Sequence, residues 1–182
     1  MEIVKGIKQS KLVKYVFYAL IGTVLLAISS KIKIPFYPVP MTMQTFVVLF
    51  IGIAFGWKLG TFTIILYLFE GIIGLPVFSG TPEKGVGFVY FTGPTMGYLI
   101  GFIFAAFFSG VFQYSQNILM NFLKLVFSTI FIYVIGLLWL GNLIGWEKPI
   151  LEIGAKPFLL AEIFKILLLS LLVKKIVKLR SF

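Results

Sequence analysis

The segment GVGFVYFTGPTMGYLIGF, residues 85–102, marks the point where a long loop passes into an apolar helix. Proline suits the first position of a helix and a threonine side chain can cap free N–H groups, so we expect a helix that begins near Pro94 with Thr92 as its cap. Gly97 and Gly101 then share one face of this helix, because they are four residues apart. Such a helix start is either a plain capped membrane span or part of a site for polar atoms.

The composition around this segment is that of a membrane protein. Of the 182 residues, 60% are hydrophobic and 12% are charged, and the mean hydropathy is +1.07. A soluble domain needs more polar surface than this. Several apolar runs approach the roughly 20 residues that cross a bilayer as a helix, and the alternating pattern of a membrane barrel is absent from the sequence. We expect an all-α integral membrane protein, a single membrane domain over residues 1–182, located in the cell membrane as a multi-pass protein.

The sequence contains no cysteine and no histidine, although its net charge is +10. Without these residues, thiol nucleophiles, imidazole bases and most transition-metal sites are excluded, so we expect no metal and no cofactor. The positive charge could suggest nucleic acid. However, the basic residues concentrate at the two chain ends beside membrane segments, where anionic headgroups account for them. We therefore expect membrane lipid as a partner and no nucleic acid.

Six apolar spans account for the hydrophobic runs. Their approximate limits are 14–31, 45–55, 58–75, 93–114, 122–141 and 157–173. Clusters of lysine precede the first span and follow the last. Because positive residues flank the cytoplasmic ends of membrane helices, we predict a six-transmembrane-helix bundle with both termini in the cytoplasm. The span at 45–55 is too short for a full crossing unless the residues before it join it.

Small residues repeat along the first span. Ala19, Thr23 and Ala27 follow one another at four-residue intervals and therefore share one helical face. Small residues at this spacing let a second helix approach closely within lipid. This face either docks a separate membrane subunit or packs internally.

Two predicted outer loops contain features of a ligand site. Residues 32–45 include three prolines within six residues, which favours a stiff, extended segment, and they end in hydrogen-bonding side chains. Residues 71–92 form a long loop with little helix-forming character, and loops of this length are often lids or binding loops. We expect the Pro35–Pro40 segment and the Thr81–Thr92 loop to close over a ligand, although the proline-rich segment could serve only to turn the chain.

Charged residues inside the last span give the clearest indication of a site. Glu162 and Lys165 are three residues apart, so they project from one helical face. Charges at membrane depth are costly unless they face a cavity, a substrate or each other. We expect this pair to contact substrate, with a self-satisfied ion pair as the alternative. In the fifth span, Tyr133, Gly136 and Trp139 also come together, either as part of an interfacial aromatic belt or as a stacking surface.

Taken together, these motifs resemble the BioY family. The motifs, in chain order, are Pro35-x-x-Pro-Val-Pro-x-Thr-x-Gln-Thr45, Gly74-Leu-Pro-Val-Phe78, Gly93-Pro-Thr-x-Gly-Tyr-Leu-x-Gly-Phe102, Tyr133-x-x-Gly-x-x-Trp-Leu140 and Lys156-Pro-Phe158. Members of that family are biotin-binding S-components of energy-coupling-factor (ECF) transporters. The resemblance implies the six-helix S-component fold and capture of biotin from outside. It also implies a transmembrane coupling subunit and two cytosolic ATPase subunits as partners, and no enzymatic activity.

Biotin makes specific demands on a pocket. Its ureido ring has two N–H donors and a carbonyl acceptor, and its apolar chain ends in a carboxylate, so the pocket needs an acceptor, donors and aromatic walls. We expect Glu162 as the acceptor, Lys165 and Gln44 as donors, and Ala19, Thr23 and Ala27 as the docking face for the coupling subunit. The expected substrate-binding residues are Gln44, Phe78, Ser79, Tyr90, Tyr98, Trp139, Glu162 and Lys165.

Two departures from the family pattern bear on the ligand. Glu162 stands where the family normally has aspartate, and Met96 stands where it usually has glycine. The longer side chain of Glu162 leaves a biotin precursor or another vitamin as an alternative substrate. An intramembrane lipid-modifying enzyme is an alternative of another class, but it would lack a histidine, a cysteine or a carboxylate cluster. A channel would need a continuous polar path. Because the sequence has no phosphate-binding P-loop, ATP would be used by another chain.

Overall fold

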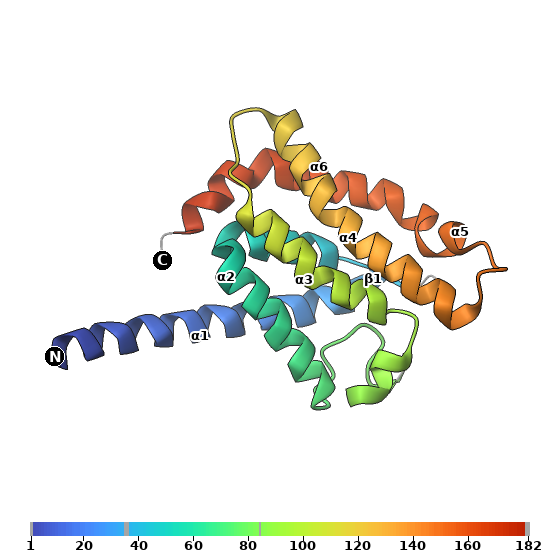
Figure 1. Ribbon diagram of the computed structural model, residues 1–182, viewed down its shortest axis with the longest axis horizontal. Helices are drawn as coiled ribbons and strands as arrows, with labels where there is room; N and C mark the ends of the chain where they lie inside the picture. Colours follow the sequence, from blue (N-terminus) through green and yellow to red (C-terminus); the bar gives the residue numbers. More distant parts are fainter. Residues whose placement is uncertain (1, 35–36, 84, 181–182) are drawn as a thin grey trace.

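Most of the described chain is helical (Figure 1). The computed structural model describes residues 2–34, 37–83 and 85–180, with no side-chain description for residues 2–10. The predicted loop residues Pro35 and Lys84 lie outside the described residues. The elements are α1 (Glu2–Lys31), β1 (Lys33–Ile34), β2 (Met41–Thr42), α2 (Gln44–Ile72), η1 (Gly87–Thr92), α3 (Met96–Val111), α4 (Ile118–Ile144), α5 (Ile150–Gly154), α6 (Lys156–Val177) and η2 (Lys178–Arg180).

Helix α2 consists of two helical legs that meet at Gly56. The backbone of Gly56 has φ +72° and ψ 173°, a conformation that residues with a side chain rarely adopt. The legs stay close beside this break, because a Cβ on Gly60 would lie 3.1 Å from the Cα of Gly52. The break falls between the predicted spans 45–55 and 58–75, and it lets these two segments turn back on each other.

Within the part of the chain that the structure describes, three helical stretches are long and apolar enough to cross a membrane. They are Lys11–Lys31, Gln44–Ile72, which includes the break at Gly56, and Ile118–Ile144, while Met96–Val111 is a shorter apolar helix. Helix α6 is more charged, because Glu162 and Lys165 lie within it and lysines occupy its last turn. The chain is therefore a mostly helical membrane protein.

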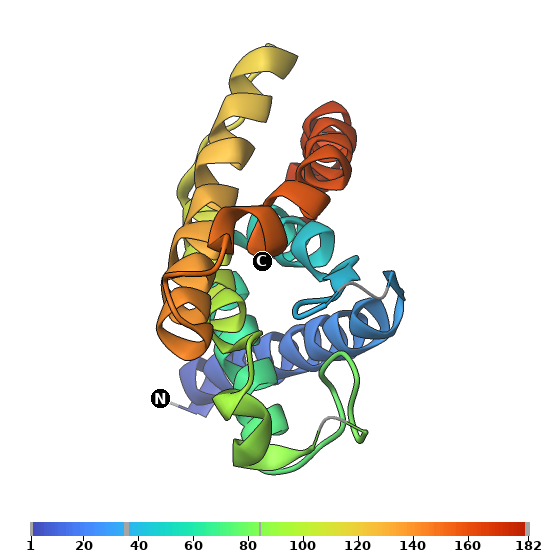
Figure 2. The ribbon, with the colours of Figure 1, turned by 90° about the vertical axis from the view of Figure 1, so that its right-hand side faces the viewer.

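Helix α3 packs between α2 and α4, and α6 packs against both of these helices. In Figure 2, α4 and α6 stand on opposite sides of the view and α1 runs across its lower part. Helix α1 packs mainly against α2, and its N-terminal part extends beyond the rest of the molecule (Figure 1). The proline-rich loop is closed by the antiparallel pair β1–β2, in which Lys33 is opposite Thr42.

The glycine face predicted on α3 is confirmed as a helix contact. A Cβ on Gly101 would lie 2.5 Å from the Cα of Ile132 in α4, and one on Gly97 would lie 2.6 Å from the carbonyl oxygen of Ile135. The predicted cap is wrong, because α3 begins at Met96 and the Thr92 hydroxyl donates to the Val89 carbonyl within η1. The chain turns at Gly93 to Thr95 before the helix starts, so Thr92 is too distant to cap it.

Replacing Gly101 by alanine is expected to destabilise the protein. Alanine is more favourable than glycine inside a helix by about 1 kcal/mol. However, the added methyl group would press against the Cα of Ile132. Overpacking of this kind costs about 1–3 kcal/mol. The thermal unfolding midpoint of the purified chain should therefore fall. Val111→Leu enlarges an exposed residue at the end of the same helix and should leave the midpoint unchanged. An unchanged midpoint for Gly101→Ala would contradict the close contact.

The predicted docking face on α1 is covered in this structure. Ala19 and Thr23 are 0% and 3% exposed, and Ala27 packs against the core. A Cβ on the neighbouring Gly22 would lie 3.2 Å from Phe55 of α2, which identifies α2 as the covering helix. The internal-packing alternative therefore describes this conformation. Docking of a coupling subunit on this face stays a prediction, and it would require α1 to move away from α2.

Candidate substrate-binding site

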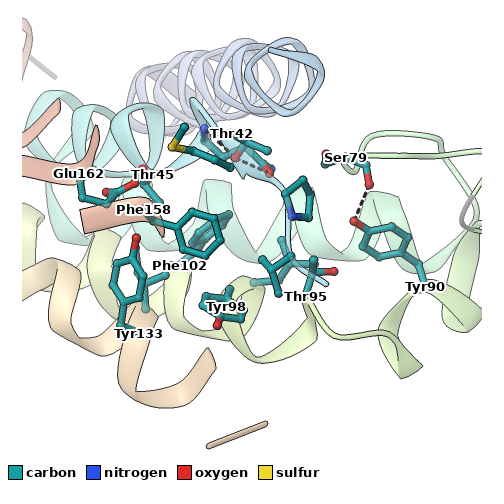
Figure 3. A pocket seen from close by; sticks show the side chains of 16 residues that line it. Thr42, Thr45, Ser79, Tyr90, Thr95, Tyr98, Phe102, Tyr133, Phe158 and Glu162 are labelled. Atoms are coloured by element: carbon teal, nitrogen blue, oxygen red, sulfur yellow. Dashed lines mark hydrogen bonds between the residues drawn. The ribbon is translucent and has the colours of Figure 1, made fainter. Parts of the chain in front are cut away.

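A small cavity lies where the start of α2, the start of α3, the C-terminal half of α4 and the start of α6 approach one another. Its volume is about 60 Å³. Its walls are Val39, Pro40, Met41, Thr42, Gln44, Thr45, Ser79, Tyr90, Thr95, Tyr98, Leu99, Phe102, Ile132, Tyr133, Phe158 and Glu162. Figure 3 places Glu162 and Thr45 at one end, Ser79 and Tyr90 at the other, and aromatic side chains between them.

The Glu162 end is built by a buried network centred on Lys165. The Lys165 ammonium group donates to Glu162 Oε1 at 2.7 Å, to the Thr42 carbonyl at 2.6 Å and to Thr45 Oγ1 at 3.0 Å. The Thr45 hydroxyl in turn donates to Glu162 Oε1 at 2.8 Å. Because an ammonium group has three N–H donors, all of those on Lys165 are used by the protein. Lys165 therefore holds Glu162 and the start of α2 together and does not line the cavity.

Two polar atoms at the cavity have no hydrogen-bond partner among the described residues. They are Glu162 Oε2 and Ser79 Oγ, in residues that are 5% and 4% exposed. A buried polar group without a partner is costly, and for a charged group the penalty is larger. Since Oε1 of the same carboxylate already accepts two hydrogen bonds, Oε2 is the oxygen of Glu162 that remains available as an acceptor. The cavity thus has an acceptor at one end and a hydroxyl at the other.

The Ser79 end is held in place by hydrogen bonds from several helices. Lys31, at the end of α1, donates to the carbonyl groups of Phe78 and Thr81 at 2.9 and 3.2 Å. The Tyr90 hydroxyl of η1 donates to the Ser79 carbonyl at 2.7 Å. Burial raises the pKa of the Tyr90 hydroxyl above its ordinary value, so this group stays protonated and remains a donor.

Gln44 connects the cavity wall to the same loop. Its side-chain amide donates to the Tyr67 hydroxyl at 2.7 Å, and that hydroxyl donates to the Val77 carbonyl at 2.9 Å. Ser30 of α1 donates to the same carbonyl at 2.8 Å. The start of α2 and the 77–81 loop are therefore coupled through one hydrogen-bonded chain, which fixes the spacing between the two ends of the cavity.

Five of the eight predicted substrate-binding residues line the cavity: Gln44, Ser79, Tyr90, Tyr98 and Glu162. The other three are Phe78, Trp139 and Lys165. Phe78 is 1% exposed and fills the space beside Gly71, where any Cβ would overlap its ring, so it belongs to the core. The Trp139 indole donates to the Gly93 carbonyl at 2.9 Å and supports the turn before α3. The expectation that these two rings form the walls is corrected accordingly.

Other wall residues were absent from the expected set. Phe158, Phe102 and Tyr133 supply the aromatic surface, and in Figure 3 the Tyr133 hydroxyl points toward Glu162. Tyr98 is fixed by donation to the Gly154 carbonyl at 2.9 Å. The Tyr133 motif was visible in the sequence, but its i, i+3, i+6 spacing could not separate the residue that faces the cavity from Trp139, which does not.

The fold and this cavity define a class of protein: a helical membrane protein with a small cavity whose lining includes one buried carboxylate. Among the described residues that line the cavity, Glu162 is the only charged one. The surrounding walls are mostly apolar and aromatic, which is typical of sites that orient a small molecule by a few polar contacts.

Comparisons with known proteins narrow this class. The model of the BioY family matches residues 4–182. The chain is 34% identical over 141 residues to the probable biotin transporter BioY of Pyrococcus horikoshii, covering 78% of this chain and 82% of that protein. It is 32% identical over 160 residues to the biotin transporter BioY of Thermotoga maritima, with coverage of 87% and 93%.

The fold is also similar to a solved structure. The crystal structure of the S-component for biotin from an ECF-type ABC transporter matches with a TM-score of 0.75 and 28% sequence identity, over 93% of each chain. The family match, which covers nearly the whole sequence, agrees with this similarity. The chain belongs to the BioY family.

Proposed function

We propose that this protein is the substrate-binding S-component of an ECF transporter and that its substrate is biotin. The single observation that carries the proposal is the unpaired, buried Glu162 Oε2 at the cavity. A ureido ring has two N–H donors, and either can donate a hydrogen bond to this acceptor. The biotin transporters named among its relatives support the same ligand.

The charge of the site favours one orientation of biotin. A biotin carboxylate beside Glu162 would place two negative charges together in a buried site, which is strongly unfavourable. The ureido ring therefore belongs at the Glu162 end and the carboxylate toward Ser79, whose hydroxyl is an unpaired donor. Lys31, bonded to the same loop, is the nearby cation at that end. In this arrangement Lys165 is a positioning residue that aims the carboxylate of Glu162.

The membrane topology is part of the proposal. With the two legs of α2 counted separately, α1, α2, α3, α4 and α6 supply six long helical segments, the number expected of an S-component. The lysines at both chain ends favour cytoplasmic termini in the plasma membrane. The cavity then lies toward the outside, where biotin is captured. A transmembrane coupling subunit and two cytosolic ATPase subunits would provide energy for uptake, and this chain would perform no chemistry of its own.

Binding of biotin requires the cavity to expand. Sites for small molecules commonly have volumes of about 300–1,000 Å³, and the cavity here measures about 60 Å³. An outer cleft of about 310 Å³, lined by Tyr37 and Leu143 among others, shares Tyr90 and Thr95 with the cavity. We propose that biotin enters through this cleft and that the loops on either side of it rearrange.

Spin labels across the outer cleft are expected to change their separation when biotin binds. Because the chain has no cysteine, Tyr37→Cys and Leu143→Cys provide two unique labelling sites, and both positions are exposed. Double electron–electron resonance of the labelled chain should give a distribution of label-to-label distances that is shifted and narrower with biotin than without it. A pair at Phe62 and Leu123, on exposed faces of α2 and α4 away from the cleft, should stay unchanged. Identical distributions at the 37–143 pair would contradict loop closure.

Calorimetry tests the choice of ligand directly. The detergent-purified chain is titrated with biotin, with the biotin precursor dethiobiotin, with thiamine and with riboflavin. Saturable binding of biotin, tighter than that of the other three, is the expected result. Preferential binding of dethiobiotin or of another vitamin would keep the S-component assignment and replace the substrate. Absence of binding by all four would contradict the proposed function.

A further inference from the structure

A second cleft lies at the far ends of the helices that build the substrate cavity. The first leg of α2 runs from Gln44 at the cavity to Phe55 at this cleft, and α6 runs from Glu162 toward Lys178. The cleft has a volume of about 410 Å³. Its walls include Lys11, Lys14, Tyr15 and Tyr18 of α1, together with Phe55 and Lys178.

All the charged residues that line this cleft are lysines. Lys11, Lys14 and Lys178 form no ion pair with a side chain that the structure describes. The ion pairs that it does describe, Lys156–Glu152 and Lys165–Glu162, belong to α5 and α6 near the substrate cavity. Three uncompensated ammonium groups around one concave space repel one another and attract an anion.

The geometry of this cleft depends on Arg180. Its guanidinium donates to the Ile53 carbonyl of α2 at 2.6 Å and lies 6.0 Å from the centre of the Tyr114 ring. These contacts hold η2 against the turn of α2, so Lys178 faces the lysines of α1. Arg180 is thus engaged by the protein, and Lys11, Lys14 and Lys178 are the cations that the cleft itself offers to a ligand.

An apolar groove continues from the basic cleft. It has a volume of about 660 Å³ and shares Tyr15 and Phe55 with the cleft. Leu12, Val16 and Phe62 contribute its apolar wall, and each is exposed in the structure. Lys58 and Arg180 also line this groove, and the Lys58 ammonium group lies over the Trp57 ring. The two spaces together match a molecule with an anionic head and a long hydrocarbon tail.

We propose that the cleft and the groove bind one anionic phospholipid. The headgroup phosphate lies among Lys11, Lys14 and Lys178, and an acyl chain follows the groove along Leu12 and Phe62. Basic pockets between membrane helices on the cytoplasmic side suit anionic headgroups, and tyrosine side chains suit the membrane interface. A free phosphate ion would satisfy the lysines but leave the groove empty. An acidic protein segment would satisfy the charges without needing a continuous hydrocarbon groove, so the lipid accounts for both features.

Native mass spectrometry of the delipidated full chain measures this binding. Phosphatidylglycerol and phosphatidylcholine with identical acyl chains are added in competition. Each lysine near a membrane surface contributes about fivefold to the affinity for an anionic lipid, so three lysines favour phosphatidylglycerol by roughly 100-fold. Lys11→Gln/Lys14→Gln/Lys178→Gln should remove that preference. The matched control, Lys33→Gln/Lys148→Gln/Lys156→Gln, removes the same charge near the substrate end and should retain it.

Further measurements distinguish binding of a lipid from binding of other anions. Leu12→Ser/Phe62→Ser should weaken binding of both lipids while leaving the headgroup preference intact, because it alters only the groove. Inorganic phosphate in excess should not displace phosphatidylglycerol, and a polyglutamate peptide should bind more weakly than the lipid. The proposal is overturned if phosphate displaces the lipid or if the peptide binds more tightly than the lipid. It is also overturned if the two lipids bind equally, or if the two lysine variants lose the same amount of headgroup preference. None of these outcomes decides the biotin assignment, which calorimetry with biotin tests separately.

Discussion

Replacing Glu162 by glutamine is expected to weaken biotin binding by roughly 10- to 100-fold, because a hydrogen bond to a charged group is stronger than one to a neutral group. Glu162→Asp keeps the carboxylate and restores the residue usual in the family, so binding should survive. Glu162→Ala removes the acceptor altogether and should weaken binding by at least about 100-fold. Calorimetry with the purified variants gives these affinities directly.

The chain contains a matched control for this substitution. Glu152 and Lys156 also form a glutamate–lysine pair, with an N–O distance of 2.6 Å, but their side chains are 59% and 63% exposed, against 7% for each side chain of the Glu162–Lys165 pair. Glu152→Gln should therefore leave biotin affinity unchanged. If Glu162→Ala and Lys165→Ala both bind biotin as tightly as the parent, the pair has only a structural role and the assigned site is wrong.

Replacing Lys165 by methionine is expected to destabilise the fold strongly as well as to weaken binding. The substitution removes three hydrogen bonds and leaves the Glu162 carboxylate buried without its counter-charge. Removing one partner of a buried ion pair commonly costs about 3–5 kcal/mol, whereas replacing both partners is often close to neutral. The double variant Glu162→Gln/Lys165→Met should consequently unfold at a higher temperature than Lys165→Met alone.

Stability and binding should separate in this double variant. Its thermal unfolding midpoint recovers toward that of the parent, but its affinity for biotin does not, because the carboxylate acceptor is absent. If the double variant is as unstable as Lys165→Met, the loss comes from packing around Thr42 and Thr45 and not from an unpaired charge. If its biotin affinity also recovers, Glu162 is not the ligand acceptor.

Helix periodicity and helix breakers were sufficient to predict much of the fold. The gap between the spans 45–55 and 58–75 coincides with Gly56, whose backbone conformation breaks α2. Gly97 and Gly101 were placed on one face by their spacing, and that face does contact α4. These features are local, so the sequence pattern contains them. The covered face of α1 was different: small residues allow close approach of any helix, and their spacing cannot identify which helix approaches.

The site was predictable only in part for the same physical reason. The spacing of Glu162 and Lys165 revealed a pair on one helical face, but their hydrogen bonds to Thr45 join positions 117 and 120 residues apart in the chain. No local pattern encodes that contact. Phe78 and Tyr90 lie in one loop, yet one ring fills the core and the other lines the cavity, because the loop path, fixed by Lys31 and Tyr67, determines where each ring lies.

The Gly56 break gives the first leg of α2 a mechanical property. At one end of the leg, Lys165 donates a hydrogen bond to Thr45, and at the other end Arg180 donates one to the carbonyl of Ile53. Thr45 and Ile53 are about 12 Å apart along the helix at the usual helical rise. Between these two residues the leg is a continuous helix, and Gly56 interrupts the helix shortly after Ile53. A ligand that shifted Thr45 would therefore act on Ile53 and, through Arg180, on the C-terminal segment. The first leg of α2 thus connects the cavity to the C-terminal segment at the other end of the bundle through one continuous stretch of helix.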